Sequence, residues 1–132
     1  METQIARVID VKDSVSKTKI ITLDKKLDFK PVQWIYVFVE KWGFNIKKPY
    51  SLASLPNANI ELLVEDVGYV SHKLCSLGPG NELEISKQIF GEFTIKDNHK
   101  NNVFIAFDTG IAPFRGMVPQ VLENNANARL IY

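Results

Sequence analysis

Apolar and polar residues alternate along most of the first 95 positions of the chain, and Val, Ile and Thr are frequent there. Strands that bury one face show this period of two, and these residue types favour extended backbone. Short strands separated by polar turns predict a small antiparallel barrel or sandwich. The predicted strands cover residues 4–15, 18–23, 32–40, 50–54, 60–67, 79–86 and 91–95, with residues 41–49 returning the chain.

One stretch breaks this alternation. In "GYVSHKLCSLG" the apolar residues Val70, Leu74 and Leu77 lie at helical spacing, with Gly68 before them and Gly78 after them. Apolar residues at this spacing, followed by a glycine, predict one short helix that ends near Gly78.

The pattern changes again at the polar segment "KDNHKNN", and we place a domain boundary between residues 99 and 100. After it come a buried-type strand at 102–107, a tight Thr-Gly turn, a helix within 111–128 and a strand at 129–132. This order predicts a β-α-β unit. Because such a unit alone leaves open sheet edges and one uncovered face, we expect further protein to complete a second domain.

The helix of this unit carries an apolar face and two prolines. The expected apolar face comprises Phe114, Val118, Val121 and Leu122. Met117 is expected to stand apart from it. Pro113 suits a first helical turn, where its missing N–H costs nothing, whereas Pro119 is expected to kink or shorten the helix.

Composition narrows the class of protein. The chain has 132 residues, of which 45% are hydrophobic and 23% charged, as in an ordinary soluble globular protein. A net charge of +1 creates no overall field that would recruit nucleic acid or an anionic membrane. No apolar stretch approaches the roughly 18–20 residues of a membrane span. Since the N-terminus also lacks the apolar run of a signal peptide, we expect a cytoplasmic protein with no nucleic-acid partner.

The charge is unevenly distributed along the chain. Residues 1–50 carry ten Lys/Arg and six Asp/Glu, whereas residues 51–132 carry six and nine. The basic excess of the first part is either an ordinary solvated face or a docking patch for an acidic partner.

The number of cysteines and the positions of the histidines argue against disulfides and metal sites. Cys75 is the only cysteine, so no internal disulfide, zinc cluster or cysteine-ligated iron–sulfur centre can form, and a buried, small apolar role is expected for it. His72 and His99 have no companions at metal-ligand spacing. We therefore expect no metal site.

The stretch "KKPYSLAS" is the first candidate for chemistry. Pro49 favours extended backbone at Lys48, and side chains two apart on a strand share a face, so Lys48 and Tyr50 lie together. A cation beside a flat ring can hold a phosphate and stack a ring system, and the hydroxyl of Ser51 can donate to a ring nitrogen. The alternative is a half-buried tyrosine that serves packing.

Two further motifs are candidates for phosphate binding. In "GYVS", Gly68 allows close approach at a helix start, and Ser71 is either a phosphate contact or an N-terminal cap. In "DTGIAP", a strand, a tight turn and a helix start form a geometry that can receive a dinucleotide pyrophosphate, although Asp108 and Thr109 can instead cap the helix.

The order of these motifs resembles the ferredoxin–NADP reductase superfamily of flavin-dependent oxidoreductases. "VQWIYVFV" is similar to the strand before the family's flavin motif, "KPYSLAS" to its Arg-x-Tyr-Ser signature and "GYVSHKL" to its Gly-x-x-Ser pyrophosphate turn. "LGPGNELEI" with "IFGEF" is similar to its closing strands, and "VFIAFDTGIAPFRGM" to the opening of its pyridine-nucleotide domain. The resemblance covers essentially the whole chain.

The resemblance implies a mainly β fold with two domains. A six-stranded antiparallel Greek-key barrel with one short helix, binding FAD in preference to FMN, would occupy residues 1–99. The incomplete beginning of an α/β NAD(P)-binding domain would occupy residues 100–132. The implied function is hydride transfer from NAD(P)H to the flavin and release of electrons to an acceptor protein, with a further subunit or chain segment completing the nucleotide domain.

The resemblance also implies roles for individual residues. Tyr50 would pack on the isoalloxazine ring and Ser51 would hydrogen-bond near its N5, which makes these two the catalytic candidates. The residues implied to hold the pyrophosphate are Lys48 with its neighbour Pro49, and the turn formed by Gly68, Tyr69, Val70 and Ser71. Val64 and Glu65 would offer backbone contacts to the ring or ribityl chain, and Thr109 and Gly110 would face the nicotinamide nucleotide.

Two departures from the family pattern leave other functions open. Lys48 replaces an arginine, which keeps the charge but loses the planar bidentate fork. Phe107 and Asp108 stand where the family commonly has two glycines, so a side chain and an anion lie where a nucleotide phosphate would approach. One alternative is therefore an FAD-binding electron-relay subunit that does not use NAD(P)H. Another is a barrel scaffold without a cofactor.

Overall fold

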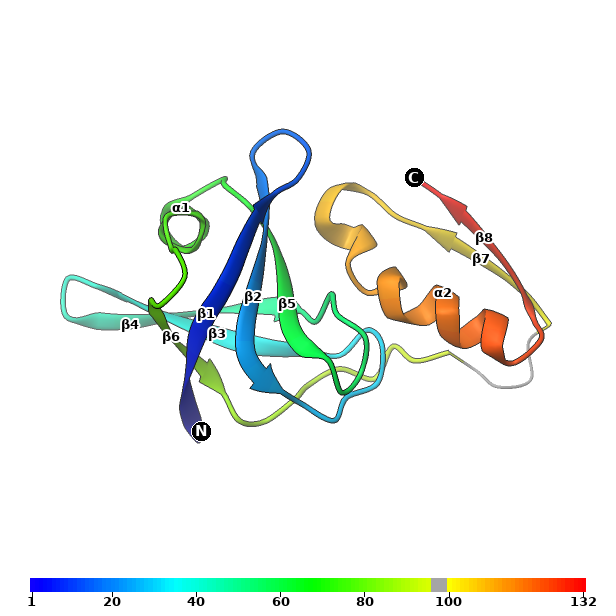
Figure 1. Cartoon of the computed structure of the whole chain (residues 1–132), viewed down its shortest axis with the longest axis horizontal. Coiled ribbons are helices and arrows are strands. Elements are labelled where there is room, and N and C mark those ends of the chain that lie inside the picture. Colours follow the sequence, from blue (N-terminus) through cyan, green and yellow to red (C-terminus); the bar gives the residue numbers. More distant parts are fainter. Residues whose placement is uncertain (96–99) are drawn as a thin grey trace.

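The computed structural model describes residues 1–95 and 100–132, and its larger part is a curled sheet of six antiparallel strands (Figure 1). The strands are β1 (Thr3–Asp13), β2 (Thr18–Lys26), β3 (Trp34–Lys41), β4 (Phe44–Ser51), β5 (Asn59–Glu65) and β6 (Glu82–Ser86). Their order is β4-β3-β6-β1-β2-β5, so β6 returns between β1 and β3. The predicted mainly β, six-stranded antiparallel fold is confirmed.

The sheet curls until its two edge strands approach each other. Leu52, just after β4, forms an isolated antiparallel bridge with Leu62 of β5. The N–H of Ala53 also donates a hydrogen bond of 2.9 Å to the carbonyl of Glu61. These two contacts join the edges at one end only, so the rest of the gap between β4 and β5 stays open.

Alternating apolar residues fill the barrel. The fully buried ones include Ile21, Leu23, Ile35, Val37, Ile60, Leu62, Val64 and Ile85. The helix α1 (Tyr69–Cys75) adds Val70, Leu74 and Cys75 to this core, while its exposed face carries His72 and Lys73. The predicted helix is therefore present, and it ends at Cys75, three residues before Gly78.

Two strand predictions need correction. Residues 44–49 of the returning segment and the start of the strand predicted at 50–54 form one strand, β4, because Trp42 and Gly43 reverse the chain in a tight turn with φ angles of 51° and 79°. The strand predicted at 91–95 is wrong. The chain pairs only through the isolated Trp34–Phe90 bridge, after which Gly91, with φ of 105°, leaves the extended path.

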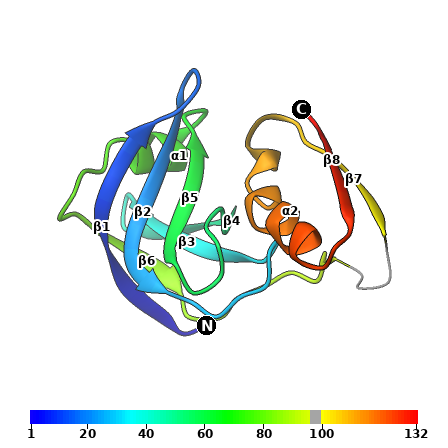
Figure 2. The same ribbon diagram turned by 45° about the vertical axis from the view of Figure 1, so that its right-hand side comes forward.

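The smaller part is the predicted β-α-β unit. The parallel strands β7 (Asn101–Ile105) and β8 (Asn127–Ile131) are connected by the 3-10 helix η1 (Asp108–Ile111) and by α2 (Phe114–Glu123). Figure 2 shows α2 between this sheet and the barrel. The helix is shorter than predicted, because Asn124 caps it and Asn125 turns the chain with a φ of 54°.

Two details of this unit differ from the predictions. Met117 is 3% exposed and lies in the second core, whereas Leu122 is 57% exposed. The buried row thus follows Phe114, Met117 and Val121, which is the i, i+3, i+7 stripe of one helix face. The strand predicted as buried is covered on one face only, since Val103 and Ile105 point into solvent.

The β-α-β unit packs directly on the barrel. Val32, in the loop before β3, belongs to the second core, and Arg115 of α2 forms a 2.8 Å ion pair with Glu61 of β5. A Cβ on Gly116 would lie 3.0 Å from the ring atoms Cβ and Cγ of Pro31. The domain boundary predicted between residues 99 and 100 borders residues 96–99, outside the described residues, and stays a prediction.

No helix within residues 1–95 and 100–132 combines the length and the apolar character needed to cross a bilayer.

Candidate functional site

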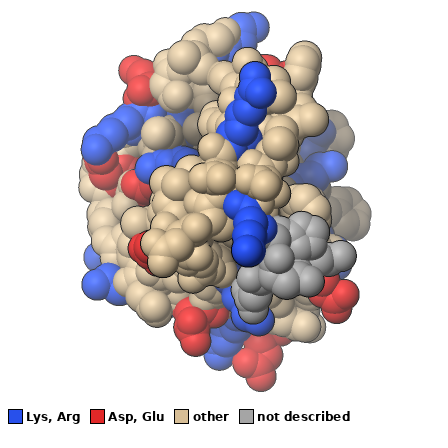
Figure 3. Space-filling model, turned by 90° about the vertical axis from the view of Figure 1, so that its right-hand side faces the viewer, with Lys and Arg blue, Asp and Glu red and all other residues tan. Residues whose placement is uncertain are grey.

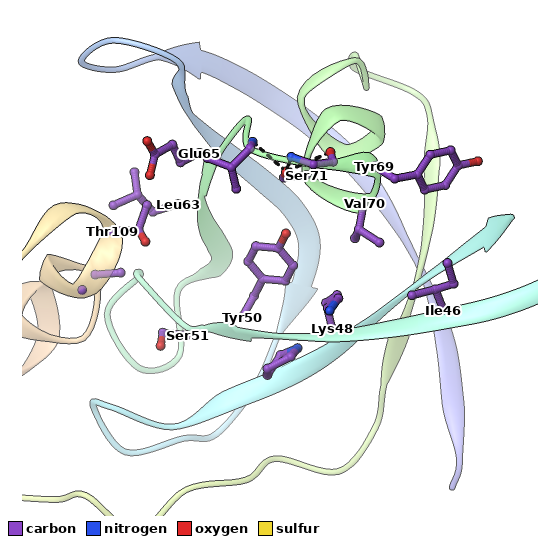
Figure 4. A pocket seen from close by; sticks show the side chains of 15 residues that line it. Ile46, Lys48, Tyr50, Ser51, Leu63, Glu65, Tyr69, Val70, Ser71 and Thr109 are labelled. Atoms are coloured by element: carbon purple, nitrogen blue, oxygen red, sulfur yellow. Dashed lines mark hydrogen bonds between the residues drawn. The ribbon is translucent and has the colours of Figure 1, made fainter.

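A pocket of about 710 Å³ lies at the open side of the barrel, between β4, β5, α1 and η1 (Figure 4). Its size is in the range of small-molecule and cofactor sites. The lining residues are Ile46, Lys48, Pro49, Tyr50, Ser51, Leu63, Glu65, Val67, Gly68, Tyr69, Val70, Ser71, Thr109, Gly110 and Ala112. The three motifs singled out in the sequence therefore meet in one pocket.

Strand β4 supplies the floor of the pocket. Since side chains alternate along a strand, Ile46, Lys48 and Tyr50 share one face, and Figure 4 shows them in a row. Pro49 is tolerated between them because β4 is an edge strand in the sheet order, where a missing N–H costs little. The row places an apolar side chain, a cation and an aromatic ring in sequence.

The cation of this row is available for a ligand. Lys48 forms no ion pair within residues 1–95 and 100–132, whereas the neighbouring Lys47 lies on the other face, with its Nζ 4.7 Å from the ring centroid of Tyr36. A lysine ammonium can hold a phosphate as a point charge. The two adjacent lysines therefore have different environments, and only Lys48 faces the pocket.

Tyr50 occupies the centre of the pocket (Figure 4). Its ring is half-buried beside the barrel core. Burial, and secondarily the nearby Cys75, raises the pKa of Tyr50 above its ordinary value of 10.0. The phenol is thus neutral at physiological pH, and it can donate a hydrogen bond while its ring offers a flat surface for stacking.

The turn that begins α1 forms the opposite wall. The hydroxyl oxygen of Ser71 accepts hydrogen bonds from the N–H groups of Val67 and Gly68, at 3.0 and 2.9 Å, and the hydroxyl donates to the Gly68 carbonyl at 3.1 Å. The residue is 7% exposed. The structure thus shows the capping role of Ser71, which holds the turn in shape beside Lys48.

The end of the pocket near Ser51 is formed by η1. Thr109, Gly110 and Ala112 line it, and Figure 4 places Thr109 near Leu63 and Glu65 of β5. The two preceding residues do not line the pocket. Phe107 is 86% exposed, and Asp108 has a φ of 48°, a region that is uncommon for a residue other than glycine.

The pocket brings together eleven of the twelve residues predicted for the site. The exception is Val64, whose side chain is fully buried in the barrel and whose carbonyl accepts a 3.6 Å hydrogen bond from the Cys75 thiol. Sequence reasoning missed Ile46, Leu63, Val67 and Ala112. Strand alternation signals the first two, since Ile46 shares a face with Lys48 and Leu63 shares one with Glu65.

Metal-ligating groups do not gather in the described part of the chain. It holds no group of three or more His, Cys, Asp or Glu side chains placed to bind a metal ion. His72 pairs with Asp66, with a distance of 3.0 Å from Nδ1 to the carboxylate. His99 lies outside the described residues.

The pocket residues are arranged in an order that suits an elongated ligand with an anionic group next to a flat ring. Lys48 lies between the aromatic ring of Tyr50 and the far end formed by Ile46 and Tyr69. Ser51 and Thr109 add hydroxyl groups at the Tyr50 end. Cation, ring and hydroxyls in this order match a nucleotide with a stacked ring system and a phosphate link.

Comparison with known proteins extends this picture. No family model matches the chain. It is 30% identical over 147 aligned residues to the anthranilate 1,2-dioxygenase electron transfer component of Acinetobacter baylyi, covering 98% of this chain and 40% of that protein. It is also 30% identical over 93 residues to NADPH-dependent diflavin oxidoreductase 1 of Candida albicans, covering 61% of this chain and 16% of that protein. The chain thus spans less than half the length of these curated relatives.

Solved structures show the same fold. A ferredoxin NADP+ reductase from Neisseria gonorrhoeae with bound FAD and NADP superposes with a TM-score of 0.88 at 19% identity, over 98% of this chain and 56% of that one. An Amycolatopsis cytochrome P450 reductase superposes with a TM-score of 0.84 at 24% identity, over 97% and 42%. The chain therefore has the fold of ferredoxin–NADP reductase-like FAD-binding domains, which confirms its resemblance to that superfamily.

Proposed function

We propose that the pocket binds FAD and that this chain is the flavin-binding part of an oxidoreductase, which passes electrons between a nicotinamide nucleotide and an acceptor protein. The observation that carries the proposal is the row on β4, where Lys48 has no ion-pair partner among the described residues and Tyr50 presents its ring beside it. The similarity to an electron transfer component over 98% of the chain supports the same assignment.

The residues of the pocket fit the groups of FAD in order. Tyr50 would stack on the isoalloxazine ring, and the hydroxyl of Ser51 would donate a hydrogen bond near N5. Lys48 would neutralise the pyrophosphate, with the Gly68–Ser71 turn against it. Bound flavin supplies the ability to take up a hydride and pass on electrons, while the protein groups position and tune it.

The hydroxyl group of Tyr50 gives a further reason to expect a ligand in the pocket. No hydrogen bond links the Tyr50 hydroxyl to another described residue, although the side chain is half-buried. A polar group that is partly withdrawn from water and faces a pocket is satisfied when a ligand occupies the pocket. Glu65 and the backbone of Val64 would then contact the ring or ribityl chain from β5.

The nicotinamide nucleotide would enter from the side of η1. Thr109 and Gly110 line that end of the pocket, so they would face the flavin ring and the incoming cofactor. In this proposal residues 1–99 form the flavin domain and residues 100–132 begin the nucleotide domain. Further protein, either a chain segment or another subunit, would cover the exposed Val103 and Ile105 of β7.

One observation favours a second function, an electron relay that does not meet NAD(P)H. Asp108 is exposed and anionic directly before Thr109, and the exposed Phe107 precedes it. A carboxylate at this place repels the phosphates of an incoming dinucleotide and disfavours its binding. Under this alternative the same flavin would exchange electrons with proteins only.

Anaerobic stopped-flow mixing separates the two functions. The purified protein is loaded with FAD and mixed with NADH or NADPH, and absorbance of the flavin is followed, with dithionite as the control that the flavin is reducible. The oxidoreductase proposal predicts rapid bleaching by at least one nicotinamide nucleotide. Bleaching by dithionite alone would reject it in favour of the relay, and failure to retain any flavin would reject both.

A further inference from the structure

A second, smaller cavity of about 170 Å³, which we call the side chamber, adjoins the pocket near η1. Leu63 and Glu65 line both spaces, and Figure 4 shows them beside Thr109. A water molecule takes up about 30 Å³ of liquid, so the side chamber has room for roughly five or six waters. Because cofactor sites begin at roughly 300 Å³, this space suits one functional group of a ligand and not a whole cofactor.

Every polar side chain that lines the side chamber ends in oxygen. Two residues contribute carboxylates and four contribute hydroxyl groups, whereas none of the lining residues is Lys, Arg or His. The carboxylates belong to Glu65 and Asp108, and the hydroxyls to Ser14, Ser16, Thr18 and Tyr132. A space with this lining attracts a positive charge that carries hydrogen-bond donors.

The two carboxylates of the side chamber have no cationic partner. Within residues 1–95 and 100–132, neither Glu65 nor Asp108 forms an ion pair. The nearby Lys19 pairs instead with Asp13, with 3.8 Å between Nζ and the carboxylate. Like charges that share a small space disfavour each other, and a cation between them removes that cost.

The hydroxyl of Thr18 gives independent evidence for a ligand. Thr18 pairs directly with Glu65 across β2 and β5, so both side chains lie on the same face of the sheet, toward the side chamber. The residue is only 9% exposed, and its hydroxyl forms no hydrogen bond with another described residue. Such a group costs free energy until a donor reaches it.

We propose that Glu65, Asp108 and Thr18 form a cation site that receives the ammonium or guanidinium group of a lysine or arginine on the electron acceptor protein. The assignment of this partner rests on the proposed function. An ammonium group has three N–H donors and a guanidinium group five, which the carboxylates and the hydroxyl accept. Since Glu65 lines both spaces, a basic side chain in the side chamber holds the acceptor at the Tyr50 end of the pocket.

A titration of the purified chain without flavin tests the cation site itself. The probe is methylguanidinium chloride, followed by nitrogen–proton correlation NMR, with sodium chloride at the same concentrations as the control for ionic strength. We expect saturable shifts in the amide signals of Thr18, Glu65 and Asp108, with a Kd of roughly 10 mM or below.

Variants locate the site. Glu65→Gln and Asp108→Asn should each raise the Kd for methylguanidinium at least about threefold, because each removes one of the two negative charges. Thr18→Val keeps the shape of the side chain without its hydroxyl and should raise the Kd about twofold. The matched control is Glu84→Gln, which removes a carboxylate on β6, outside the side chamber, and should leave the Kd unchanged.

A second experiment tests the charge of the acceptor. The protein is loaded with FAD, reduced with dithionite and mixed with hexaammineruthenium(III), a cation, or ferricyanide, an anion. Reduced flavin loses two electrons, one to each of two metal complexes, and releases its proton to the buffer. At low salt, Glu65→Gln and Asp108→Asn should slow oxidation by the ruthenium complex roughly 3- to 10-fold without slowing oxidation by ferricyanide. Glu84→Gln should change neither rate by as much.

The outcomes separate this inference from the function on which it rests. Shifts that do not saturate, or an equal Kd in folded Glu65→Gln and Asp108→Asn, would overturn the cation site. Saturable binding together with an unchanged rate for the ruthenium complex in these variants would overturn the assignment of a basic acceptor. A protein that binds methylguanidinium but retains no flavin refutes the proposed function, and the acceptor with it, while the cation site stands.

Discussion

Among single residues, Tyr50 is the most important for the proposed site, because it packs against the barrel core and also lines the pocket. Lys48 and Ser51 on either side face the same pocket, and Ser71 holds the opposing turn through three hydrogen bonds. The ring of Tyr50 therefore packs in part against the barrel core before any ligand arrives, which lowers the entropic cost of stacking.

Replacing Tyr50 separates the ring from its hydroxyl. Tyr50→Ala should raise the Kd for FAD roughly 10- to 100-fold, because the stacking surface is lost. Tyr50→Phe keeps the ring, so it should bind FAD within a few-fold of the unmodified protein. Both are measured by quenching of flavin fluorescence, with circular dichroism to show that the variants are folded. An unchanged Kd in Tyr50→Ala would remove this residue from the site.

The thiol next to Tyr50 predicts an alkaline loss of stability. Burial, then the Asp66 carboxylate, raises the pKa of Cys75 above its ordinary value of 9.0, with Lys19 opposing in part. The unfolded chain therefore loses this proton at lower pH than the folded chain, and the free energy of unfolding falls as pH rises through 9. Tyr50, whose pKa is raised above 10.0 by burial, adds a second loss at higher pH.

Urea unfolding at a series of pH values measures this effect. Cys75→Ala should lower the free energy of unfolding at neutral pH through lost packing, but it should lose less stability between pH 9 and 10 than the unmodified protein. Parallel pH profiles for the two proteins would contradict a raised thiol pKa in the folded state.

Much of the site at this scale was accessible from the sequence, because alternation along a strand is a local property. Alternation placed Lys48 and Tyr50 on one face of the strand. It also placed Ile46 on that face, but an apolar residue there is not distinguishable by sequence from a core residue. Val67 and Ala112 enter the pocket only through tertiary packing and carry no local signal. The reading of Ser71 as a cap or a phosphate contact needed the coordinates of the Gly68 turn.

At the level of elements, α2 joins the two parts of the chain. Its Arg115 pairs with Glu61, and its Gly116 lies against Pro31, so the helix meets both β5 and the loop before β3. Pocket residues Thr109 and Gly110 belong to the turn immediately before this helix. Close packing of α2 on the barrel therefore sets the position of one end of the pocket.

Gly116→Ala tests this packing. The new Cβ would lie 3.0 Å from two ring atoms of the buried Pro31, which are too stiff to yield easily. Overpacking of this kind costs about 1–3 kcal/mol, more than the gain of up to about 1 kcal/mol in helix propensity. Thermal unfolding should therefore show a lower Tm. Gly78→Ala is the control, since its Cβ would meet nothing within 4 Å, and equal stability of Gly116→Ala and the unmodified protein would contradict the contact.

The errors in the predicted elements have local causes. The hairpin at Trp42–Gly43 lacks the Asn-Gly or Asp-Gly signal of a two-residue turn, so the beginning of β4 at Phe44 was missed. At 91–95 the composition favours a strand, but the left-handed Gly91 turns the chain away from β3. The apolar stripe of α2 shifted by one position because Met117 packs in the second core.

On the scale of the whole molecule, the strand order could not come from alternation, which says which face a residue takes but not which strands pair. The resemblance of the ordered motifs implied a six-stranded Greek-key barrel, whereas the order β4-β3-β6-β1-β2-β5 needed the structure. The uncovered face of the β7–β8 sheet, in contrast, was predicted from a general rule: a sheet needs other protein to cover its apolar faces and open edges. Val103, Ile105, Ile131 and Tyr132 are indeed exposed there, and Figure 3 shows that much of this end of the molecule is uncharged.

The central claim is that this pocket holds FAD, and titration of the purified chain with FAD tests it most directly. Absorbance and quenching of flavin fluorescence report the bound fraction. We predict one FAD per chain with a Kd at or below roughly 1 µM, at least tenfold tighter than in Tyr50→Ala. A protein that is folded by circular dichroism and yet leaves the flavin spectrum and fluorescence unchanged at about 100 µM would contradict the account.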